Sequence, residues 1–356
     1  MRVLFLDPGA RSYHVDTPLH EPLGGTESAI VYLAEALGQQ GVDVALANGR
    51  ESSERIVIQG GISRVSAACV SPDRLQESDV ILVNAAAVAP VVRAGAPGAR
   101  IVLWSGREDD QPQVRELSDV AVREMFAGFA FVSQWQAAQY TRRFGIDPRR
   151  VRVLRNGIAP SVEVGAVVQP MRADPHRVAY TSVPYRGLSV LLDAWPLVRR
   201  AVPDGALHVF SDMALHGGDD RAFAPLYARC RATEGIRYWG TCAQPILARE
   251  LAKTAVLAYP GLWPETSCIS VLEALASGCR VVTSTRGALP ETCAGFASLV
   301  EPGSDFTERY AAAVCAALLG GSSEETAAAV LHVLTHHCWA GIARAWRAWL
   351  EQLVRS

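Results

Sequence analysis

Short apolar runs alternate with amphipathic segments along the whole chain. The runs predict buried strands over residues 2–7, 42–47, 80–84, 100–104, 129–133, 151–154, 177–182, 206–210, 236–240, 255–259 and 280–284. Apolar positions at helical spacing between these runs predict helices, among them 134–144, 187–200 and 267–277. Strands that alternate with helices favour an α/β protein whose parallel sheets are covered by helices on both faces.

The length of the chain favours two domains. It has 356 residues, which is more than one ordinary hydrophobic core serves. Residues 159–175 contain three prolines and little periodicity, so they predict a linker. We therefore expect one doubly wound domain over residues 1–165, a second over 166–335, and a C-terminal helix over 336–356. The tryptophans of that helix, which we expect to pack between the domains, are Trp339, Trp346 and Trp349.

Two carboxylates stand out in the stretch 255–284, which predicts a strand, a loop, a helix and a second strand. Glu265 follows the first strand, where doubly wound sheets bind ligands, and Glu273 lies inside the helix among apolar neighbours. The start of the helix offers free backbone N–H groups that suit phosphate, at Thr266, Ser267 and Cys268. A solvated loop glutamate is the simpler interpretation of Glu265. For Glu273 the apolar neighbours favour burial, and together the two glutamates favour a ligand with phosphates and hydroxyls.

Composition excludes several classes of function. A net charge of −2 disfavours nucleic acid as a main partner. No G-x-G-x-x-G opens a helix after the first strand, which disfavours hydride transfer on a dinucleotide. The eight cysteines have no metal-ligand spacing and indicate a reducing, cytoplasmic location. The first apolar run ends at Asp7, too early for a signal peptide, and no stretch is long enough to span a membrane. Many arginines beside a single lysine, Lys253, indicate a GC-rich bacterial genome.

The loop over residues 8–24 is long for a connection between a strand and a helix. Such a loop is either functional or disordered, and we favour acceptor binding by its polar side chains, namely Arg11, His14 and His20. Gly24 and Gly25 then open a helix. A plain helix start capped by Thr26 is the alternative for this turn.

Glu265 and Glu273, separated by seven residues and followed by Ala-Leu-Ala-Ser-Gly, resemble the signature of family-4 retaining glycosyltransferases with the GT-B fold. The resemblance also covers the segments 24–27, 156–158 and 182–187, so it spans nearly the whole chain. It implies two Rossmann-like domains that face each other across a cleft, with the last helix returning to the first domain. It further implies sugar transfer from a nucleotide-diphosphate sugar to a hydroxyl acceptor, with no cofactor and no metal ion, in cell-surface glycan or secondary-metabolite biosynthesis. Some relatives act on lipid acceptors, so peripheral membrane contact stays open.

The resemblance also assigns roles to residues. Arg186 and Glu265 are the expected catalytic pair: Arg186 meets the leaving diphosphate, and Glu265 contacts the donor sugar. Glu273 is expected to hold the ribose hydroxyls. The remaining donor contacts are expected at Gly24, Gly25, Thr241, Thr266, Ser267 and Cys268.

The chain departs from the family pattern at two places. Relatives carry Trp-Thr-His-Asp after the fourth predicted strand, whereas this chain has Gly106 at the histidine position and Arg107 after it, an expected acceptor-side residue. Relatives also place two cations near the diphosphate, but here Thr181 replaces the first and leaves Arg186 alone. Gly106 motivates a second hypothesis, a non-catalytic or accessory GT-B protein that binds a nucleotide sugar. A third is an epimerase or phosphorylase on the same fold, although Lys253 is expected far from the site.

Overall fold

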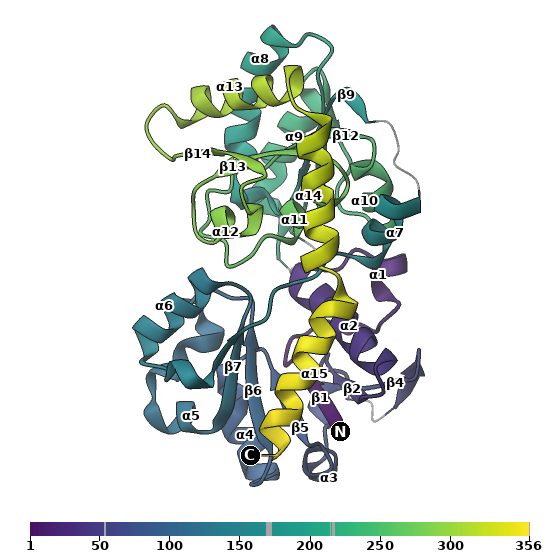
Figure 1. Ribbon diagram of the computed structural model, residues 1–356, viewed down its shortest axis with the longest axis vertical. Helices are drawn as coiled ribbons and strands as arrows, with labels where there is room; N and C mark the ends of the chain where they lie inside the picture. The colour runs from purple at the N-terminus through teal and green to yellow at the C-terminus, as the bar shows by residue number, and fades with distance from the viewer. Residues whose placement is uncertain (53–54, 169–172, 214, 216–217, 356) are drawn as a thin grey trace. The chain divides into compact units, whose positions relative to one another are not determined.

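The computed structural model describes residues 1–52, 55–168, 173–213, 215 and 218–355 (Figure 1). Contacts divide the chain into two compact units. Unit 1 comprises Met1–Thr17, Gly25–Asn156 and Trp339–Ser356, and unit 2 comprises Pro18–Gly24 and Gly157–Cys338. The main segment of unit 1 thus ends earlier than the boundary expected at residue 165.

Unit 1 contains an eight-stranded sheet with the order β3-β4-β2-β1-β5-β6-β7-β8. The strands are β1 (Arg2–Leu6), β2 (Asp43–Ala47), β3 (Val57–Gln59), β4 (Ile62–Val65), β5 (Val80–Val83), β6 (Arg100–Ser105), β7 (Phe126–Phe131) and β8 (Val151–Val153). Neighbouring strands are parallel except for the antiparallel pair β3–β4 at the edge. The sequence did not predict this hairpin, because its short, partly exposed strands have no continuous apolar run.

The side chains of β1 alternate between the two faces of this sheet, as a strand requires. Leu4 and Leu6 join a core cluster on one face. On the other face Phe5 contacts Trp104, and Trp104 contacts Trp346 in an edge-to-face arrangement with ring centroids 5.2 Å apart. The helices of unit 1 are α2 (Gly25–Gln39), α3 (Pro72–Gln76), α4 (Ala89–Gly95), α5 (Val120–Glu124), α6 (Gln134–Phe144) and α15 (Trp339–Arg355). The short helix α1 (Thr17–His20) begins at the last residue of the first segment of unit 1.

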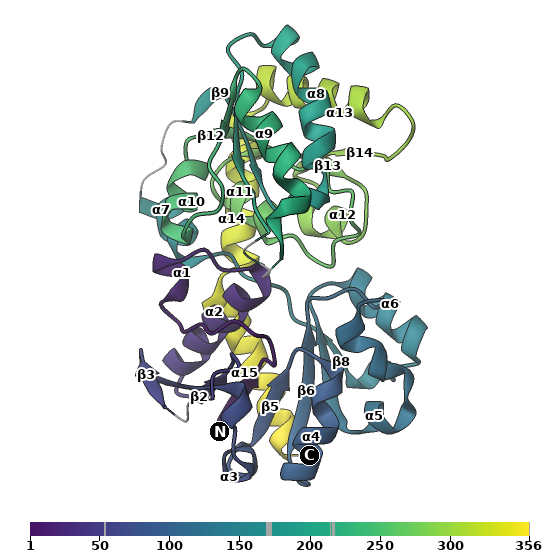
Figure 2. The same cartoon turned by 180° about the vertical axis from the view of Figure 1, so that it is seen from behind.

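The C-terminal helix α15 packs inside unit 1, beside α2 (Figures 1 and 2). Arg100 of β6 donates from Nε to the carbonyl oxygen of Leu353, and Arg347 donates to that of Gln40 at 2.7 Å. The predicted return of the last helix to the first domain is confirmed. Its tryptophans line this contact with the sheet and with α2.

Unit 2 contains a parallel six-stranded sheet with the order β11-β10-β9-β12-β13-β14. The strands are β9 (Asp174–Thr181), β10 (Ala206–Phe210), β11 (Ile236–Tyr238), β12 (Thr254–Ala258), β13 (Arg280–Ser284) and β14 (Ala297–Val300). The helices are α7 (Pro160–Val168), α8 (Leu188–Ala201), α9 (Ala224–Ala232), α10 (Gln244–Leu251), α11 (Ile269–Ala276), α12 (Leu289–Cys293), α13 (Phe306–Leu319) and α14 (Ser323–His336). The predicted class, two doubly wound sheets, is confirmed. The order of the strands reverses between β9 and β12, and such a switch point is where doubly wound sheets bind ligands.

The linker predicted over residues 159–175 is wrong for residues 160–168, which form α7. Pro160 lies at the first position of this helix, where proline is tolerated because its missing N–H has no partner there anyway. The side chain of Val162 is buried, and α7 lies beside α10 in both views (Figures 1 and 2). Pro170, also part of the predicted linker, lies outside the described residues.

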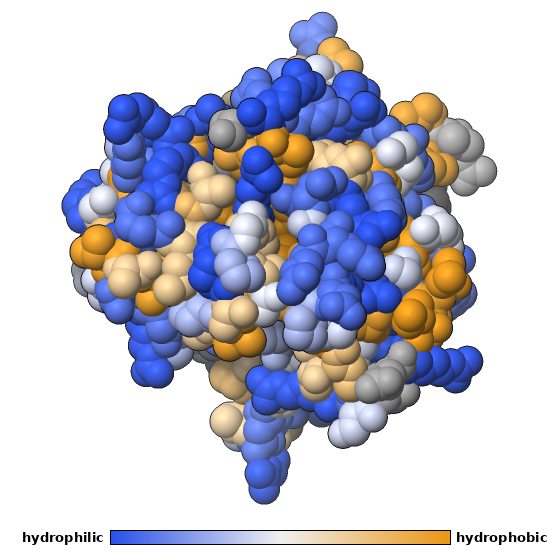
Figure 3. All heavy atoms as spheres, turned by 90° about the horizontal axis from the view of Figure 1, so that it is seen from below, coloured by the Kyte–Doolittle hydropathy of each residue, from blue (hydrophilic) through white to orange (hydrophobic). Residues whose placement is uncertain are grey.

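In the described parts of the chain, no helix has both the length and the apolar character needed to cross a membrane. The face seen in Figure 3 is mostly hydrophilic, and its apolar residues form separate patches.

Candidate functional site

Arg186 and Glu265 meet at the switch point of unit 2. Arg186 lies in the turn after β9, and Glu265 lies in the loop after β12. Arg186 Nη1 is 2.8 Å from Glu265 Oε1 and 3.1 Å from Oε2, and the Tyr259 hydroxyl donates to Oε1. Glu265 is only 3% exposed. The sequence thus predicted a pair that the structure brings into contact, but it missed Tyr259, whose place at the end of a strand next to the loop was the available signal.

Electrostatics favours the charged form of Arg186. Burial by itself lowers the pKa of the guanidinium, but the Glu265 carboxylate beside it raises that pKa well above its usual value. Burial raises the pKa of the Tyr259 hydroxyl, so this group stays protonated and donates its hydrogen bond. The result is a fixed cation held by one carboxylate.

The Glu265 loop is held in place by a close backbone approach at Gly287. The N–H of Ala288 donates to the carbonyl oxygen of Glu265 at 2.7 Å. Gly287 has a φ of +60°, and a Cβ atom there would lie 2.5 Å from Glu265 O and 2.6 Å from Glu265 N. Because both obstacles are backbone atoms, a side chain at position 287 requires the loop to move.

We expect Gly287→Ala to lower the free energy of unfolding by about 2–3 kcal/mol, from positive-φ strain plus the clash with Glu265. Denaturant unfolding measures the loss. Gly295→Ala is the matched control, because Gly295 has a φ of +87° but a Cβ there would meet nothing within 4 Å. Its expected cost is about 1 kcal/mol. Equal costs for the two variants would show that the approach at Gly287 does not constrain the loop.

Glu273 is buried in α11, as its apolar neighbours indicated. It is 3% exposed, and burial raises its pKa to about 7. The backbone N–H of Ala159 donates to Glu273 Oε1 at 3.1 Å. The carboxyl group is therefore poised near neutrality, where a donor such as a ligand hydroxyl favours its charged form.

Helix α11 begins at Ile269, two residues after the predicted start, with Cys268 as its N-cap residue. Cys268 and Thr266 are buried, and Ser267 is half-buried. Burial raises the pKa of the Cys268 thiol well above its ordinary value, so this thiol is protonated. Cys268 is a small buried residue in the structure, and its side chain makes no capping hydrogen bond.

Thr241 lies just after β11 and is held by Asp212, which follows β10. Its backbone N–H and its hydroxyl both donate to Asp212 Oδ2, at 3.1 and 2.6 Å. The sequence analysis missed Asp212. An acidic residue two positions after an apolar strand was the signal for it.

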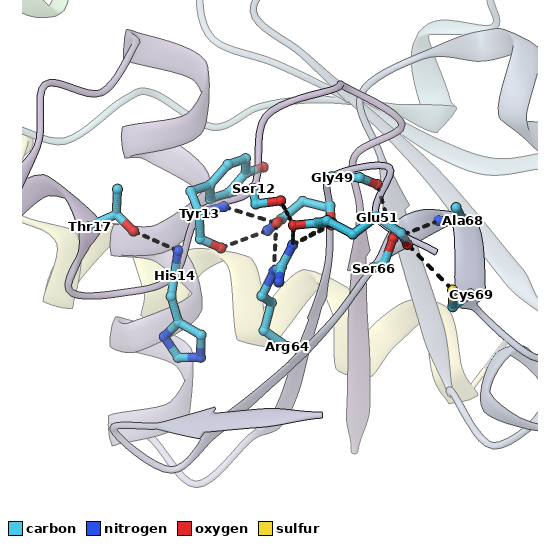
Figure 4. A network of polar contacts seen from close by, with 11 residues as sticks. Ser12, Tyr13, His14, Thr17, Gly49, Glu51, Arg64, Ser66, Ala68 and Cys69 are labelled. Carbon is cyan, nitrogen blue, oxygen red and sulfur yellow. Dashed lines mark hydrogen bonds and ion pairs between the residues drawn. The ribbon is translucent and has the colours of Figure 1, made fainter. Parts of the chain in front are cut away.

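In unit 1, the loop after β1 is held to the next strand by a polar network (Figure 4). Tyr13 and Asn48 exchange two hydrogen bonds at 3.1 and 3.0 Å, and Arg64 donates to the Asn48 side chain and to Glu51. Ser12 also donates to Glu51. These contacts favour the ordered alternative for residues 8–17.

His14 belongs to this network through its backbone N–H, which donates to the Thr17 hydroxyl at 2.8 Å. The side chain is buried and points toward the β3–β4 hairpin (Figure 4), and Nδ1 accepts from the N–H of Val15 at 2.8 Å. Burial lowers the pKa of His14, which favours the neutral ring. The acceptor contact of His14 stays a prediction.

The other predicted residues of this loop are divided between the two units. His20, which is exposed, and Gly24 both belong to the segment Pro18–Gly24, which clusters with unit 2. Gly25 begins α2 of unit 1.

Arg11 and Arg107 lie near a buried carboxyl group in the first turn of α2, that of Glu27. Burial raises the pKa of Glu27, Asp7 raises it further, and the positive charges of Arg107 and Arg11 lower it. The structure thus brings the two predicted arginines into the electrostatic neighbourhood of one carboxyl group, at the carboxyl end of β1. Glu27 belongs to the segment 24–27 that carries the resemblance, but the sequence did not predict it as a site residue.

The loop at Gly106 is fixed by its neighbours. Gln136 Nε2 and the Tyr140 hydroxyl donate to the carbonyl oxygen of Arg107, at 2.7 and 3.0 Å. A Cβ atom on Gly106 would meet nothing within 4 Å. Packing therefore leaves room for a side chain at this position, so space does not explain the glycine.

No group of three or more His, Cys, Asp or Glu side chains that could hold a metal ion occurs among the described residues. All eight cysteines are free. Lys253 follows α10 and pairs with Glu250 at 2.8 Å.

The whole chain is similar in structure to known glycosyltransferases and related enzymes. A glycosyltransferase from Rickettsia africae aligns with this chain at a TM-score of 0.75 and 14% identity, and the alignment covers 100% of this chain and 99% of the glycosyltransferase. Sucrose-phosphate synthase from Thermosynechococcus elongatus matches over 99% of both chains, with a TM-score of 0.73 and 16% identity. The Anabaena protein HepE, solved in complex with UDP-glucose, aligns with this chain at a TM-score of 0.72 and 16% identity, and the alignment covers 99% of this chain and 100% of HepE.

Sequence comparison adds a family. No match was found among curated proteins. Residues 177–319, which contain Arg186, Glu265 and Glu273, match the model of the family described as Glycosyl transferases group 1. The chain therefore has the GT-B fold, and its residues 177–319 belong to the group 1 glycosyltransferases.

Proposed function

We propose that the chain is a retaining glycosyltransferase that moves a sugar from a nucleotide-diphosphate sugar to a hydroxyl acceptor. The observation that carries the proposal is the half-buried cation Arg186, fixed by the buried Glu265 at the switch point of unit 2. A fixed cation suits a leaving diphosphate, and Glu273 in the same unit suits the hydroxyls of a ribose. The likeness to a protein solved with UDP-glucose supports the same donor class.

In the proposed step, the bond between the anomeric carbon and the β-phosphate oxygen breaks, and a bond from that carbon to the acceptor oxygen forms on the same face. The acceptor proton passes to the leaving diphosphate, so the reaction needs no protein nucleophile. Arg186 stabilises the charge that grows on the β-phosphate, and a preorganised donor of this kind acts mainly on the transition state.

Glu265 has two roles in this proposal. It holds Arg186, as its contacts indicate, and it meets a hydroxyl of the donor sugar. A carboxylate has about four lone-pair sites, and Arg186 and Tyr259 use three of them in three contacts. One site on Oε2 is left to accept from a sugar hydroxyl.

The proposal places the enzyme in the cytoplasm of a bacterium, in cell-surface glycan or secondary-metabolite biosynthesis. Eight free cysteines suit a reducing compartment. Gly106 favours a second candidate, a non-catalytic protein that binds a nucleotide sugar, because the family pattern has a histidine at this position and a Cβ atom on Gly106 would meet nothing within 4 Å.

A thermal-shift panel of nucleoside diphosphates and their sugars tests donor binding. A ligand at 100 times its Kd stabilises the folded protein by ~2.7 kcal/mol, which raises the Tm measurably. We expect at least one nucleotide to do so for the wild type and to lose most of the effect in Glu273→Ala. If the whole panel leaves the Tm of the wild type unchanged, both candidate functions are wrong.

We expect transfer to be independent of divalent metal ions, because Arg186 supplies positive charge where a metal ion would otherwise neutralise the diphosphate. The release of nucleoside diphosphate is measured with and without excess EDTA. Equal rates are expected. Activity that disappears with EDTA and returns with Mg²⁺ or Mn²⁺ would contradict this prediction.

A further inference from the structure

Unit 1 has a cavity of about 510 Å³ at its own switch point. The strand order of the eight-stranded sheet reverses between β1 and β5, and Asp7 and Asn84, the residues just after these two strands, both line the cavity. The carboxyl ends of the strands at a switch point are where doubly wound sheets bind ligands. A volume in this range suits a small molecule.

Apolar side chains line most of this cavity. They come from β1, from the 3₁₀ helix at Ala67–Cys69, from α3, from α4 and from the segment that leads into α4; examples are Leu6, Ala67, Leu75, Val88, Val91 and Val92. Val91 is 70% exposed, so apolar surface continues to the solvent. A mouth of this kind favours a ligand with an apolar body.

Asn84 gives the cavity a polar end. Its side chain is 5% exposed, and neither Oδ1 nor Nδ2 has a hydrogen-bond partner among the described residues. A buried amide without partners costs about 1–3 kcal/mol for each group left unpaired. A buried polar group without a partner calls for an explanation, and a ligand in the cavity supplies one.

We propose that this cavity binds a small apolar molecule that carries a hydroxyl group, and that the hydroxyl pairs with Asn84. A hydroxyl both donates and accepts, so it can satisfy Oδ1 and Nδ2 together. A carboxylate or a phosphate dianion only accepts and leaves Asn84 Oδ1 unpaired. Two cations also line the cavity. Arg50 is exposed, and its Nε already donates to the carbonyl oxygen of Pro8. Arg107 is half-buried, and its Nε has no hydrogen-bond partner among the described residues, so it can donate to a further acceptor atom of the same molecule.

The assignment of this molecule as the sugar acceptor rests on the function proposed above. It names the acceptor class: an aglycone with a ring system or short hydrocarbon body and an alcohol or phenol group. Asp7 lies beside Asn84 in the cavity wall, where Gly9 N–H and the Tyr13 hydroxyl hold its two carboxylate oxygens. The hydroxyl end of the bound molecule thus lies next to the carboxyl end of β1.

Calorimetric titration with 2-naphthol and naphthalene tests the proposal on the full chain. The two probes share the apolar body and differ only in the hydroxyl. The test variant is Asn84→Leu, which keeps the shape of the side chain and removes both amide atoms. We expect it to weaken 2-naphthol about tenfold, the loss of roughly one hydrogen bond, and to leave naphthalene unchanged or tighter.

Folding stability separates this role from a structural one. Because Asn84 has no partner to lose among the described residues, Asn84→Leu is expected to leave the Tm unchanged or higher. Ala67→Phe and Val88→Trp, at half-buried positions of the wall, are expected to fill the cavity and abolish binding of both probes. Two occluding variants keep the test decisive if one of them folds poorly.

Three results would overturn the proposal: no binding of 2-naphthol to the wild type, an equal loss of both probes in Asn84→Leu, or unchanged binding in both occluding variants. The outcome is independent of the donor site. Nucleotide binding without 2-naphthol binding would overturn only this inference. Binding of 2-naphthol in the cavity of a protein that binds no nucleotide would overturn the glycosyltransferase function and the acceptor role, and leave the cavity as a ligand site.

Discussion

Arg186→Ala is expected to reduce turnover of the nucleotide sugar by roughly 10²–10³, the scale seen when one preorganised charge stabiliser is removed. The affinity for the donor should fall by less, because negative charge on the β-phosphate grows as the glycosidic bond breaks. The first of the two cations in the family pattern is absent, since Thr181 occupies its place. The measurement is kcat and KM for the release of nucleoside diphosphate.

Two controls separate this effect from loss of stability. Removing Arg186 leaves Glu265 buried without its cation, so the variant is expected to unfold more easily as well. Arg177 forms a similarly buried ion pair with Glu250 in the same unit, and Arg177→Ala is expected to destabilise without a hundredfold loss of turnover. Arg186→Lys should recover only part of the rate, because an ammonium group cannot hold two phosphate oxygens in a fixed plane. Wild-type turnover in Arg186→Ala would show that another group stabilises the leaving diphosphate.

Glu273→Gln is expected to change stability and nucleotide affinity in opposite directions. Burial raises the pKa of Glu273 from 4.5 to about 7, so between these values the folded protein holds a proton that the unfolded chain has released. Stability therefore falls as the pH rises through this window, by about 3 kcal/mol in total. Glutamine carries no charge, so the variant should be more stable than the wild type by up to that amount at pH 8 and equal to it near pH 4.5.

The same substitution should weaken nucleoside diphosphate binding about 10–100-fold at pH 8, because the carboxylate accepts charge-assisted hydrogen bonds from the ribose. In the wild type, the affinity for the nucleoside diphosphate should fall as the pH drops below 7, because binding favours the carboxylate form of Glu273. Glu273→Gln should lose this part of the pH dependence, and the dependence that remains comes from protonation of the ligand's phosphates.

Denaturant unfolding and calorimetry at pH 5 and pH 8 measure the stability and the nucleotide affinity. Glu308→Gln, on an exposed position of α13, is the control. A Glu273→Gln variant that is less stable at pH 8 would contradict the account.

Much of the fold was predictable because the buried strands have continuous apolar runs. The ranges of β10, β13 and α6 coincide with the predicted ones, and β10 and α6 are each bounded by a serine and a glycine. The β3–β4 hairpin and β14 were not predicted, because their strands are short and partly exposed. Apolar periodicity reflects burial, so it does not predict elements that are little buried.

The candidate site was predictable to the extent that it follows strand ends. Glu265 and Glu273 could be chosen from their position relative to strands and helices, and Arg186 from the resemblance to the glycosyltransferase family. The close approach at Gly287, the hydrogen bond from Ala159 and the unpaired Asn84 depend on tertiary contacts between segments far apart in the chain. The local pattern of apolar and polar residues in the sequence does not predict these contacts. The burial of His14 behind the β3–β4 hairpin belongs to the same class.

The most direct test of the proposed function is the release of nucleoside diphosphate from nucleotide sugars, followed by phosphorus NMR in the presence of EDTA. We predict that the wild type releases the diphosphate from at least one member of a panel of UDP, ADP, GDP and TDP sugars, by transfer or by slow hydrolysis. Arg186→Ala is predicted to release it at least a hundredfold more slowly. Binding without any release would identify the non-catalytic alternative, and release at the same rate in wild type and Arg186→Ala would contradict the site described here.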